Sequence, residues 1–162
     1  MKIQIRFRGL VTAVLGTLAP SLASAASLPS RPVLTLEAAH SILNAAERKA
    51  RDEGWPCVVA VVDSDGLPIA LDRMDDAAVP AGVELAPGKA RTAALFRRPS
   101  GALEDAINGQ RPAALSARGF VLMRGGWPLS VGGRVIGAIG VSADTPDHDE
   151  IIAKAGAEAL EP

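Results

Sequence analysis

The chain opens its regular part with a segment of helical periodicity. Apolar residues recur at steps of three and four, at Leu36, Ala39, Leu43, Ala46 and Ala50. This is the spacing of one apolar stripe along a helix. Gly54 follows the last of them and is a typical residue for ending a helix. The pattern therefore predicts an amphipathic helix that ends at Gly54.

Short apolar runs further along the chain predict strands. Four of them have the length and composition of strands: residues 57–62, 67–73, 127–131 and 135–141. The first two flank a turn that ends in Asp65-Gly66, and the last two flank Gly132-Gly133. Both dipeptides favour tight reversals between antiparallel strands. A fifth strand is expected at residues 119–124, so the sequence predicts two hairpins in a sheet of about five strands.

A second well-marked helix follows the last strand. Thr145 offers a capping hydroxyl, and Pro146 stands at the first helical position, where its missing N–H costs no hydrogen bond. Acidic residues then complement the positive end of the helix: Asp147, Asp149 and Glu150. Less regular helical segments are expected at residues 82–85, 89–96 and 100–108.

The first 25 residues have the pattern of a secretory signal peptide. Basic residues come first, at Lys2, Arg6 and Arg8, and an uncharged apolar run covers residues 9–19. Small residues follow, which predicts cleavage after Ala25 or Ala26. The apolar run is shorter than the ~20 residues of a membrane span, and no later segment approaches that length. We therefore expect a periplasmic or secreted product without a membrane span.

Cleavage would leave a tether at residues 26–33 and one domain at 34–162. The leader holds three of the 17 basic residues and none of the 18 acidic ones, so 14 basic residues face 18 acidic ones, a net charge of about −4. This balance disfavours nucleic-acid binding. The single cysteine, Cys57, is expected to be a buried strand thiol, and the chain has no CxxCH motif for covalent haem.

Four blocks carry a resemblance to a known family: LTLEAAHSILNAAERKARDEGWP at 34–56, VVAVVDSDGLPIALDRMDDA at 58–77, GKARTAALFRRPS at 88–100 and GGWPLSVGGRVIGAIGVS at 125–142. Together they resemble the small haem-associated proteins typified by GlcG and HbpS, a family related to the C-terminal domain of PduO. The resemblance implies a profilin-like α/β (α+β) domain, with a central antiparallel sheet of about five strands flanked by helices on both faces. It also implies ring-like homo-oligomers, haem binding and an associated haem-degrading activity.

His40 is one of two histidines and lies on the first predicted helix. At 100° per residue, Asn44 and Glu47 fall on the same flank. The imidazole either faces solvent or ligates haem iron at a subunit surface. The resemblance to PduO-type domains makes His40 the matching candidate for an iron ligand and for any metal site.

His148 falls in the first turn of the last helix. The helix dipole there favours a neutral imidazole, which is the form that ligates metal, while the neighbouring acidic residues favour the charged form. His148 is therefore a second candidate for haem binding. The alternative is that it caps the helix or faces solvent.

Non-covalent haem also needs apolar walls and cations for its two propionates. The candidate polar contacts are Arg73, Lys89, Arg91 and Thr92. The candidate walls are Trp55, Phe96, Phe120 and Trp127, and the weaker axial candidates are Met74 and Met123. Each has an ordinary alternative: Arg73 paired with Asp72 or Asp75, Lys89 and Arg91 on a wet helix face, and the apolar side chains in the core.

The sequence thus favours an exported homo-oligomer that captures, buffers or oxidatively degrades haem. It leaves open whether the protein is an enzyme. One alternative is a module that binds a small organic acid through Arg73, Lys89 and Arg91. Another is a sensory partner protein without enzymatic activity. The glycine spacing matches neither GxGxxG nor GxxxxGK[ST], and there is no GxSxG, so nucleotide and hydrolase chemistry are disfavoured.

Overall fold

The structure is a computed structural model that describes residues 27–160. The expected signal peptide lies outside the described residues. The chain divides into two units, Met1–Ser30 and Arg31–Pro162, and the fold below is that of the second. Within residues 27–160, no helix has both the length and the apolar character that crossing a bilayer requires.

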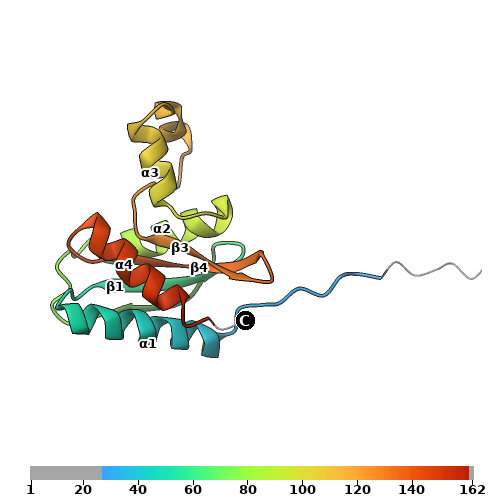
Figure 1. Cartoon of the computed structure of the whole chain (residues 1–162), viewed down its shortest axis with the longest axis horizontal. Helices are drawn as coiled ribbons and strands as arrows, with labels where there is room; N and C mark the ends of the chain where they lie inside the picture. Colours follow the sequence, from blue (N-terminus) through green and yellow to red (C-terminus); the bar gives the residue numbers. More distant parts are fainter. Residues whose placement is uncertain (1–26, 161–162) are drawn as a thin grey trace, which may run out of the picture. The chain divides into compact units, whose positions relative to one another are not determined.

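Four antiparallel strands form one sheet in the order β2-β1-β4-β3 (Figure 1). Their bounds are β1 Val58–Asp63, β2 Pro68–Arg73, β3 Gly126–Val131 and β4 Arg134–Ser142. Each predicted hairpin is confirmed, as β1–β2 and as β3–β4. The two hairpins join through β1 and β4, whose register runs from Val58 opposite Ser142 to Asp63 opposite Gly137. Both hairpin turns therefore lie at the same end of the sheet.

The prediction of a fifth strand at residues 119–124 is wrong, because this segment pairs with no strand. Two of its backbone groups form hydrogen bonds with side chains instead. The Met123 carbonyl accepts a hydrogen bond from the Ser100 hydroxyl at 2.5 Å. The Arg124 N–H donates to a carboxylate oxygen of Glu104 at 2.6 Å. The segment therefore does not extend the sheet, which has four strands.

The two strongest helix predictions are confirmed by their caps. Helix α1, Leu36–Glu53, begins where the Thr35 hydroxyl accepts from the Ala38 N–H, and it ends at Gly54 with φ 73°. Only glycine adopts that left-handed conformation freely. Helix α4, Pro146–Ala157, begins at Thr145, whose hydroxyl accepts from the His148 N–H. Local sequence therefore sets where both helices begin.

The segments predicted at 82–85 and 89–96 form one helix, α2, Gly82–Phe96. Pro87 lies inside it and removes one helical hydrogen bond. Burial of a small-residue face against the sheet compensates, since Ala86, Ala90 and Ala93 are fully buried. Helix α3, Gly101–Asn108, and the 3-10 helix η1, Pro112–Ser116, follow it and form an arm that projects from the sheet region (Figure 1).

Helices cover both faces of the sheet, which confirms the α+β class. Helices α1 and α4 lie side by side on one face, and α2 packs against β4 and β1 on the other. The main core lies under α1 and α4 and includes Ile42, Leu43, Val59, Val61, Ile139 and Ile152. On the α2 side, a Cβ at Gly140 would lie 2.0 Å from the Ala86 carbonyl oxygen. The helix on that side approaches the sheet so closely that only glycine fits beneath it.

Candidate functional site

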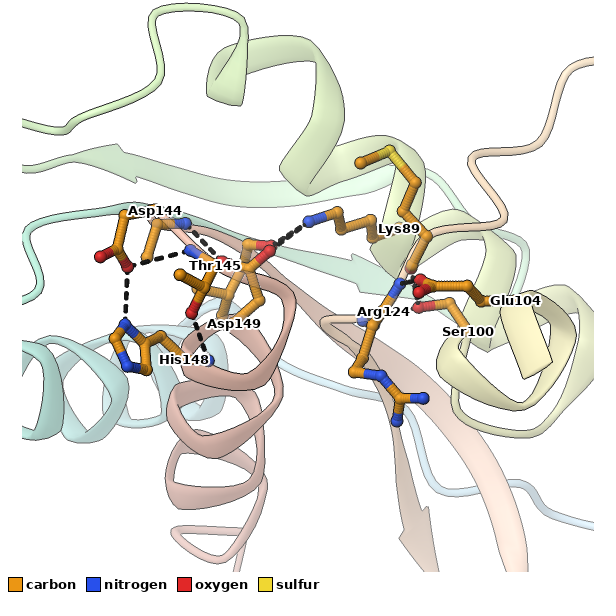
Figure 2. A network of polar contacts seen from close by, with 12 residues as sticks. Lys89, Ser100, Glu104, Arg124, Asp144, Thr145, His148 and Asp149 are labelled. Atoms are coloured by element: carbon orange, nitrogen blue, oxygen red, sulfur yellow. Dashed lines mark hydrogen bonds and ion pairs between the residues drawn. The ribbon is translucent and has the colours of Figure 1, made fainter. Parts of the chain in front are cut away.

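A buried lysine and a buried aspartate connect the two helical layers beside the end of β4 (Figure 2). Lys89 of α2 donates from Nζ to Asp149 Oδ2 of α4 at 2.5 Å and to the Val141 carbonyl at 3.0 Å. The other carboxylate oxygen, Asp149 Oδ1, accepts from the Ala143 N–H at 2.5 Å. Lys89 is 1% exposed and Asp149 6%. The pair thus joins elements sixty residues apart in the sequence.

The low dielectric around this pair sets its electrostatics. Burial raises the pKa of Asp149, and the charge and hydrogen bond of Lys89 oppose that rise. In a buried ion pair, each charge offsets the desolvation cost of the other, because either charge alone would be buried without a partner. The arrangement therefore fixes α2, α4 and the end of β4 relative to one another.

A small cavity of about 140 Å³ borders the ion pair. It is lined by Lys89 and Asp149, by Met123 and Arg124, and by the turn at residues 142–146. Ligand sites for drug-sized molecules are usually about 300–1,000 Å³. The cavity therefore suits a few waters or a small ion and is too small for a porphyrin.

Two glycines let the backbone approach the residues of the ion pair closely. Gly125 has φ 112°, and a Cβ there would lie 2.6 Å from the Asp149 Cβ. At Gly126 a Cβ would lie 2.2 Å from the Lys89 carbonyl oxygen. The glycine pair at the start of the GGWP block is thus a packing requirement of the Lys89–Asp149 region.

Arg124 anchors the projecting arm to the body. Its guanidinium donates to Glu150 of α4 at 2.7 Å and to Asp105 of α3 at 2.6 Å. The bond to Glu150 raises the pKa of Arg124, so the group stays charged. Beside it, the Ser100 hydroxyl accepts from the Gly126 N–H at 2.8 Å, which ties the start of α3 to β3.

His148 is held on two sides at the start of α4. Its Nδ1 lies 2.7 Å from Asp144 Oδ1, as Figure 2 shows. Its ring stacks on Trp55 with a centroid distance of 3.5 Å and an interplanar angle of 8°. The hydrogen bond to His148 lowers the pKa of Asp144. The imidazole is thus positioned by its own chain, with Nε2 as the remaining ring nitrogen.

His40 is exposed on α1 and differs from His148 in its surroundings. Within residues 27–160, the only imidazole held by a hydrogen bond is that of His148. Leu36 lies one helical turn before His40 and is 56% exposed. Residues four apart share a helix face, so an imidazole and an exposed apolar side chain are neighbours here.

A groove of about 520 Å³ runs between the C-terminal half of α1 and the end of β2. Arg73 and Met74 line it from the strand side, and Glu47 and Arg51 line it from the helix side. Behind Met74 lies Cys57, whose thiol sulfur is 3.7 Å from the Met74 sulfur. Burial raises the pKa of Cys57 to about 12, so the thiol is neutral. The predicted burial of Cys57 is confirmed, but the residue lies directly before β1 and not in the strand.

Arg91 and Thr92 lie on α2 but face different surroundings. Arg91 is exposed and its guanidinium carbon lies 5.8 Å from the centroid of the Phe120 ring. Thr92 is buried and its hydroxyl donates to the Gly88 carbonyl at 2.9 Å. Phe120 also meets Phe96 edge to face, with centroids 5.0 Å apart.

Comparison with known proteins identifies the family of this chain. Residues 34–158 match the family described as "Haem degrading protein HbpS-like". The chain belongs to the HbpS-like family. Protein GlcG from Escherichia coli strain K12 is 38% identical over 115 residues, which cover 71% of this chain and 85% of GlcG. The family resemblance carried by the four sequence blocks is thus confirmed.

Solved structures agree with this membership. A double mutant of HbpS from Streptomyces reticuli is 33% identical with a TM-score of 0.78, and the match covers 91% of this chain and all of that one. A PduOC structure solved as a haem complex is 29% identical with a TM-score of 0.71, covering 80% of this chain and 96% of that one. Haem is therefore present in a solved structure with this fold.

In this HbpS-like chain, the residues singled out from the sequence do not form one cluster. The three cations lie apart: Arg73 lines the α1–β2 groove, Lys89 is buried against Asp149, and Arg91 lies beside Phe120. The charge of Lys89 is already neutralised. Within residues 27–160, no group of three or more His, Cys, Asp or Glu side chains is placed to hold a metal ion.

Sequence reasoning missed two residues of this region. Asp149 was expected only to complement the helix dipole, and Arg124 only to end a strand, yet they are the partners of Lys89 and of Glu150. The signal that pointed to their region was the pair Gly125-Gly126. Adjacent glycines mark close backbone approach as well as turns.

Proposed function

We propose that this protein binds haem non-covalently, with His40 as the iron ligand, and that it acts as an exported haem-capturing or haem-buffering homo-oligomer. The observation that carries this proposal is the likeness to the PduOC haem complex over 96% of that chain. Family membership over residues 34–158 supports it. Export is proposed from the leader pattern at residues 1–25.

The surroundings of His40 fit an iron ligand better than those of His148. A ligand nitrogen must be able to reach the iron, and His40 is exposed on α1. His148 lies flat against Trp55 with Nδ1 held by Asp144. Leu36 gives the His40 face an exposed apolar neighbour for a porphyrin ring. Bound haem would supply an iron centre that accepts the imidazole nitrogen.

This face needs a second surface to complete a haem site. Cofactor sites are concave and bury most of their ligand. Within the described residues, the pockets around the groove, the ion pair and the arm contain neither His40 nor His148. A helix surface covers one side of a flat ring, so a neighbouring subunit would supply the other side. The proposed haem site and the proposed homo-oligomer therefore depend on each other.

Titration of the purified protein with haemin tests the proposal. We expect a saturable Soret band in the wild type and a loss of most of it in His40→Ala. His148→Ala is the matched control, because it removes the other imidazole, which already contacts Trp55 and Asp144 within the chain. A Soret band that survives in His40→Ala but disappears in His148→Ala would refute the assignment to His40. A non-saturating absorbance rise in the wild type would refute haem binding itself.

Light scattering tests the assembly separately. We expect a multimer at micromolar concentration, and a monomer that still binds haemin saturably would contradict the shared site. Haem turnover, the further activity expected from the family resemblance, is tested by adding peroxide to the loaded protein and following the Soret band. A steady band under peroxide would leave haem buffering as the function.

A further inference from the structure

Three arginines from distant parts of the chain line one hollow of about 500 Å³. Arg31 precedes α1, Arg97 follows the last turn of α2, and Arg134 begins β4. The register of β1 and β4 explains the convergence, because it places the β1–β2 turn and the β3–β4 turn at one end of the sheet. Gly133 and Asp65 from those turns complete the rim.

The charges around this hollow do not compensate one another. Within residues 27–160 the ion pairs between lysine or arginine and a carboxylate involve other cations, namely Lys49, Arg51, Lys89, Arg124 and Lys154. Asp65 is the one carboxylate in the lining, so three positive charges face one negative charge. Like charges gathered at a concave surface raise the local concentration of opposite ions.

The hollow contrasts with the chain as a whole, which carries a formal net charge of −1. Guanidinium groups bind carboxylate and phosphate oxygens with two parallel hydrogen bonds, so several of them favour a ligand with several anionic groups. The C-terminal end of α2 carries partial negative charge, so the guanidiniums rather than the helix must hold an anion. The volume exceeds that of a single phosphate and lies within the usual range for small-molecule sites.

Arg97 has a backbone conformation that arginine rarely adopts. Its φ is 54° and its ψ 38°, in the left-handed region where a helix usually ends with glycine. Its N–H still caps the helix by donating to the Ala93 carbonyl. A large charged residue therefore occupies a position where glycine would be less strained, at the wall of the hollow.

We propose that the hollow lined by Arg31, Arg97 and Arg134 binds a small polyanion, a molecule with at least two carboxylate or phosphate groups. Its lining includes neither His40 nor Leu36 of the proposed haem face. Binding would be strongest at low ionic strength, because exposed charges are screened within about 10 Å at 0.1 M salt.

Calorimetric titration of the purified protein with pyrophosphate and with citrate tests the proposal and distinguishes phosphate from carboxylate ligands. We expect saturable binding of at least one of them, and binding of inorganic phosphate at least tenfold weaker. Arg134→Gln should raise the dissociation constant about tenfold or more, because it removes charge-assisted hydrogen bonds. Arg97→Asn should act similarly while keeping a residue that tolerates the left-handed conformation.

Two further variants keep the test specific. Asp65→Asn should tighten binding severalfold, since it removes the negative charge from the rim. Arg48→Gln is the matched control: it removes the same charge from an exposed position on α1 outside the hollow, and we expect a change of less than twofold.

Equal weakening by Arg48→Gln and Arg134→Gln would show unspecific charge attraction and overturn the proposal. So would the absence of binding by either anion at millimolar concentration. Loss of haemin binding in Arg134→Gln, without any binding of pyrophosphate or citrate, would assign the hollow to the haem propionates and overturn a separate site. The haemin titration of His40→Ala is independent of all these outcomes.

Discussion

Charge is handled in opposite ways in two regions of the molecule. Around Lys89 and Asp149, each charge has its partner within the chain, and both side chains are almost fully buried. Around Arg31, Arg97 and Arg134, three exposed guanidiniums share one hollow with a single carboxylate. Compensated charge holds elements together, whereas uncompensated charge at a concave surface remains available to a ligand. The same residue types therefore serve the fold in one region and recognition in the other.

Breaking the buried pair should have the largest effect. Lys89→Met leaves the Asp149 carboxylate buried without its partner, and we expect a loss of about 3–5 kcal/mol in the free energy of unfolding. Denaturant unfolding measures it. The double variant Lys89→Met with Asp149→Asn should recover much of the loss, since no charge then remains buried. A single variant that loses less than ~1 kcal/mol would contradict the structural role of the pair.

The close approach of the backbone in the same region gives the next effect. Gly126→Ala would place a methyl group against the Lys89 carbonyl, and we expect a loss of about 3 kcal/mol from overpacking. Gly132→Ala is the control in the exposed β3–β4 turn. It has φ 57° and nothing within 4 Å of the added Cβ, so only backbone strain of about 1 kcal/mol remains. Equal losses in thermal unfolding would refute the packing argument.

Arg124 and Glu150 are an intermediate case, because the pair is only partly buried. Burial acts to raise the pKa of Glu150, but the bonds from Lys154 and Arg124 outweigh it and lower that pKa. The stability that the ionised Glu150 contributes is thus fully present above about pH 4, and it is lost as the pH falls through the lowered pKa of Glu150.

We expect this contribution to be less than about 1 kcal/mol after solvent screening. The check compares denaturant unfolding at pH 6 and pH 3. Arg124→Gln should lose less stability between these two pH values than the wild type does. An equal or larger acid-induced loss in the variant would contradict the assignment.

The smallest effect on stability is expected in the arginine hollow. Arg134→Gln, measured without anions, should change the free energy of unfolding by less than about 0.5 kcal/mol, as for most exposed positions. The same variant should weaken anion binding, as described above. A large loss of stability would show that Arg134 supports the fold, and the contrast between the two regions would fail.

Much of the fold follows from local sequence signals. Thr145-Pro146, Gly54 and the two glycine-containing turns act within a few residues, so they can be interpreted without knowing the rest of the chain. The strand prediction for residues 119–124 was wrong because backbone groups of this segment form hydrogen bonds with Ser100 and Glu104, which lie about twenty residues earlier. Its apolar pattern cannot distinguish a strand from a loop that covers a helix.

The candidate sites were less predictable for the same reason. A lysine on a helix usually faces water, and only contact with Asp149, distant in sequence, turns Lys89 into a buried residue. The arginine hollow escaped notice because its members come from three segments that meet only after the sheet has formed. His40 lies on a regular helix, so its exposed flank could be placed from periodicity alone.

Cys57 has a practical consequence for the experiments above. With a pKa of about 12, roughly one thiol in 10⁵ is ionised at pH 7, and the thiolate is the reactive form. We therefore expect the Cys57 thiol to react very slowly with maleimides and mild oxidants while the protein is folded. A cysteine introduced at an exposed position such as Ser116 would be labelled selectively. A fluorescent label there would report on the projecting arm without replacement of Cys57.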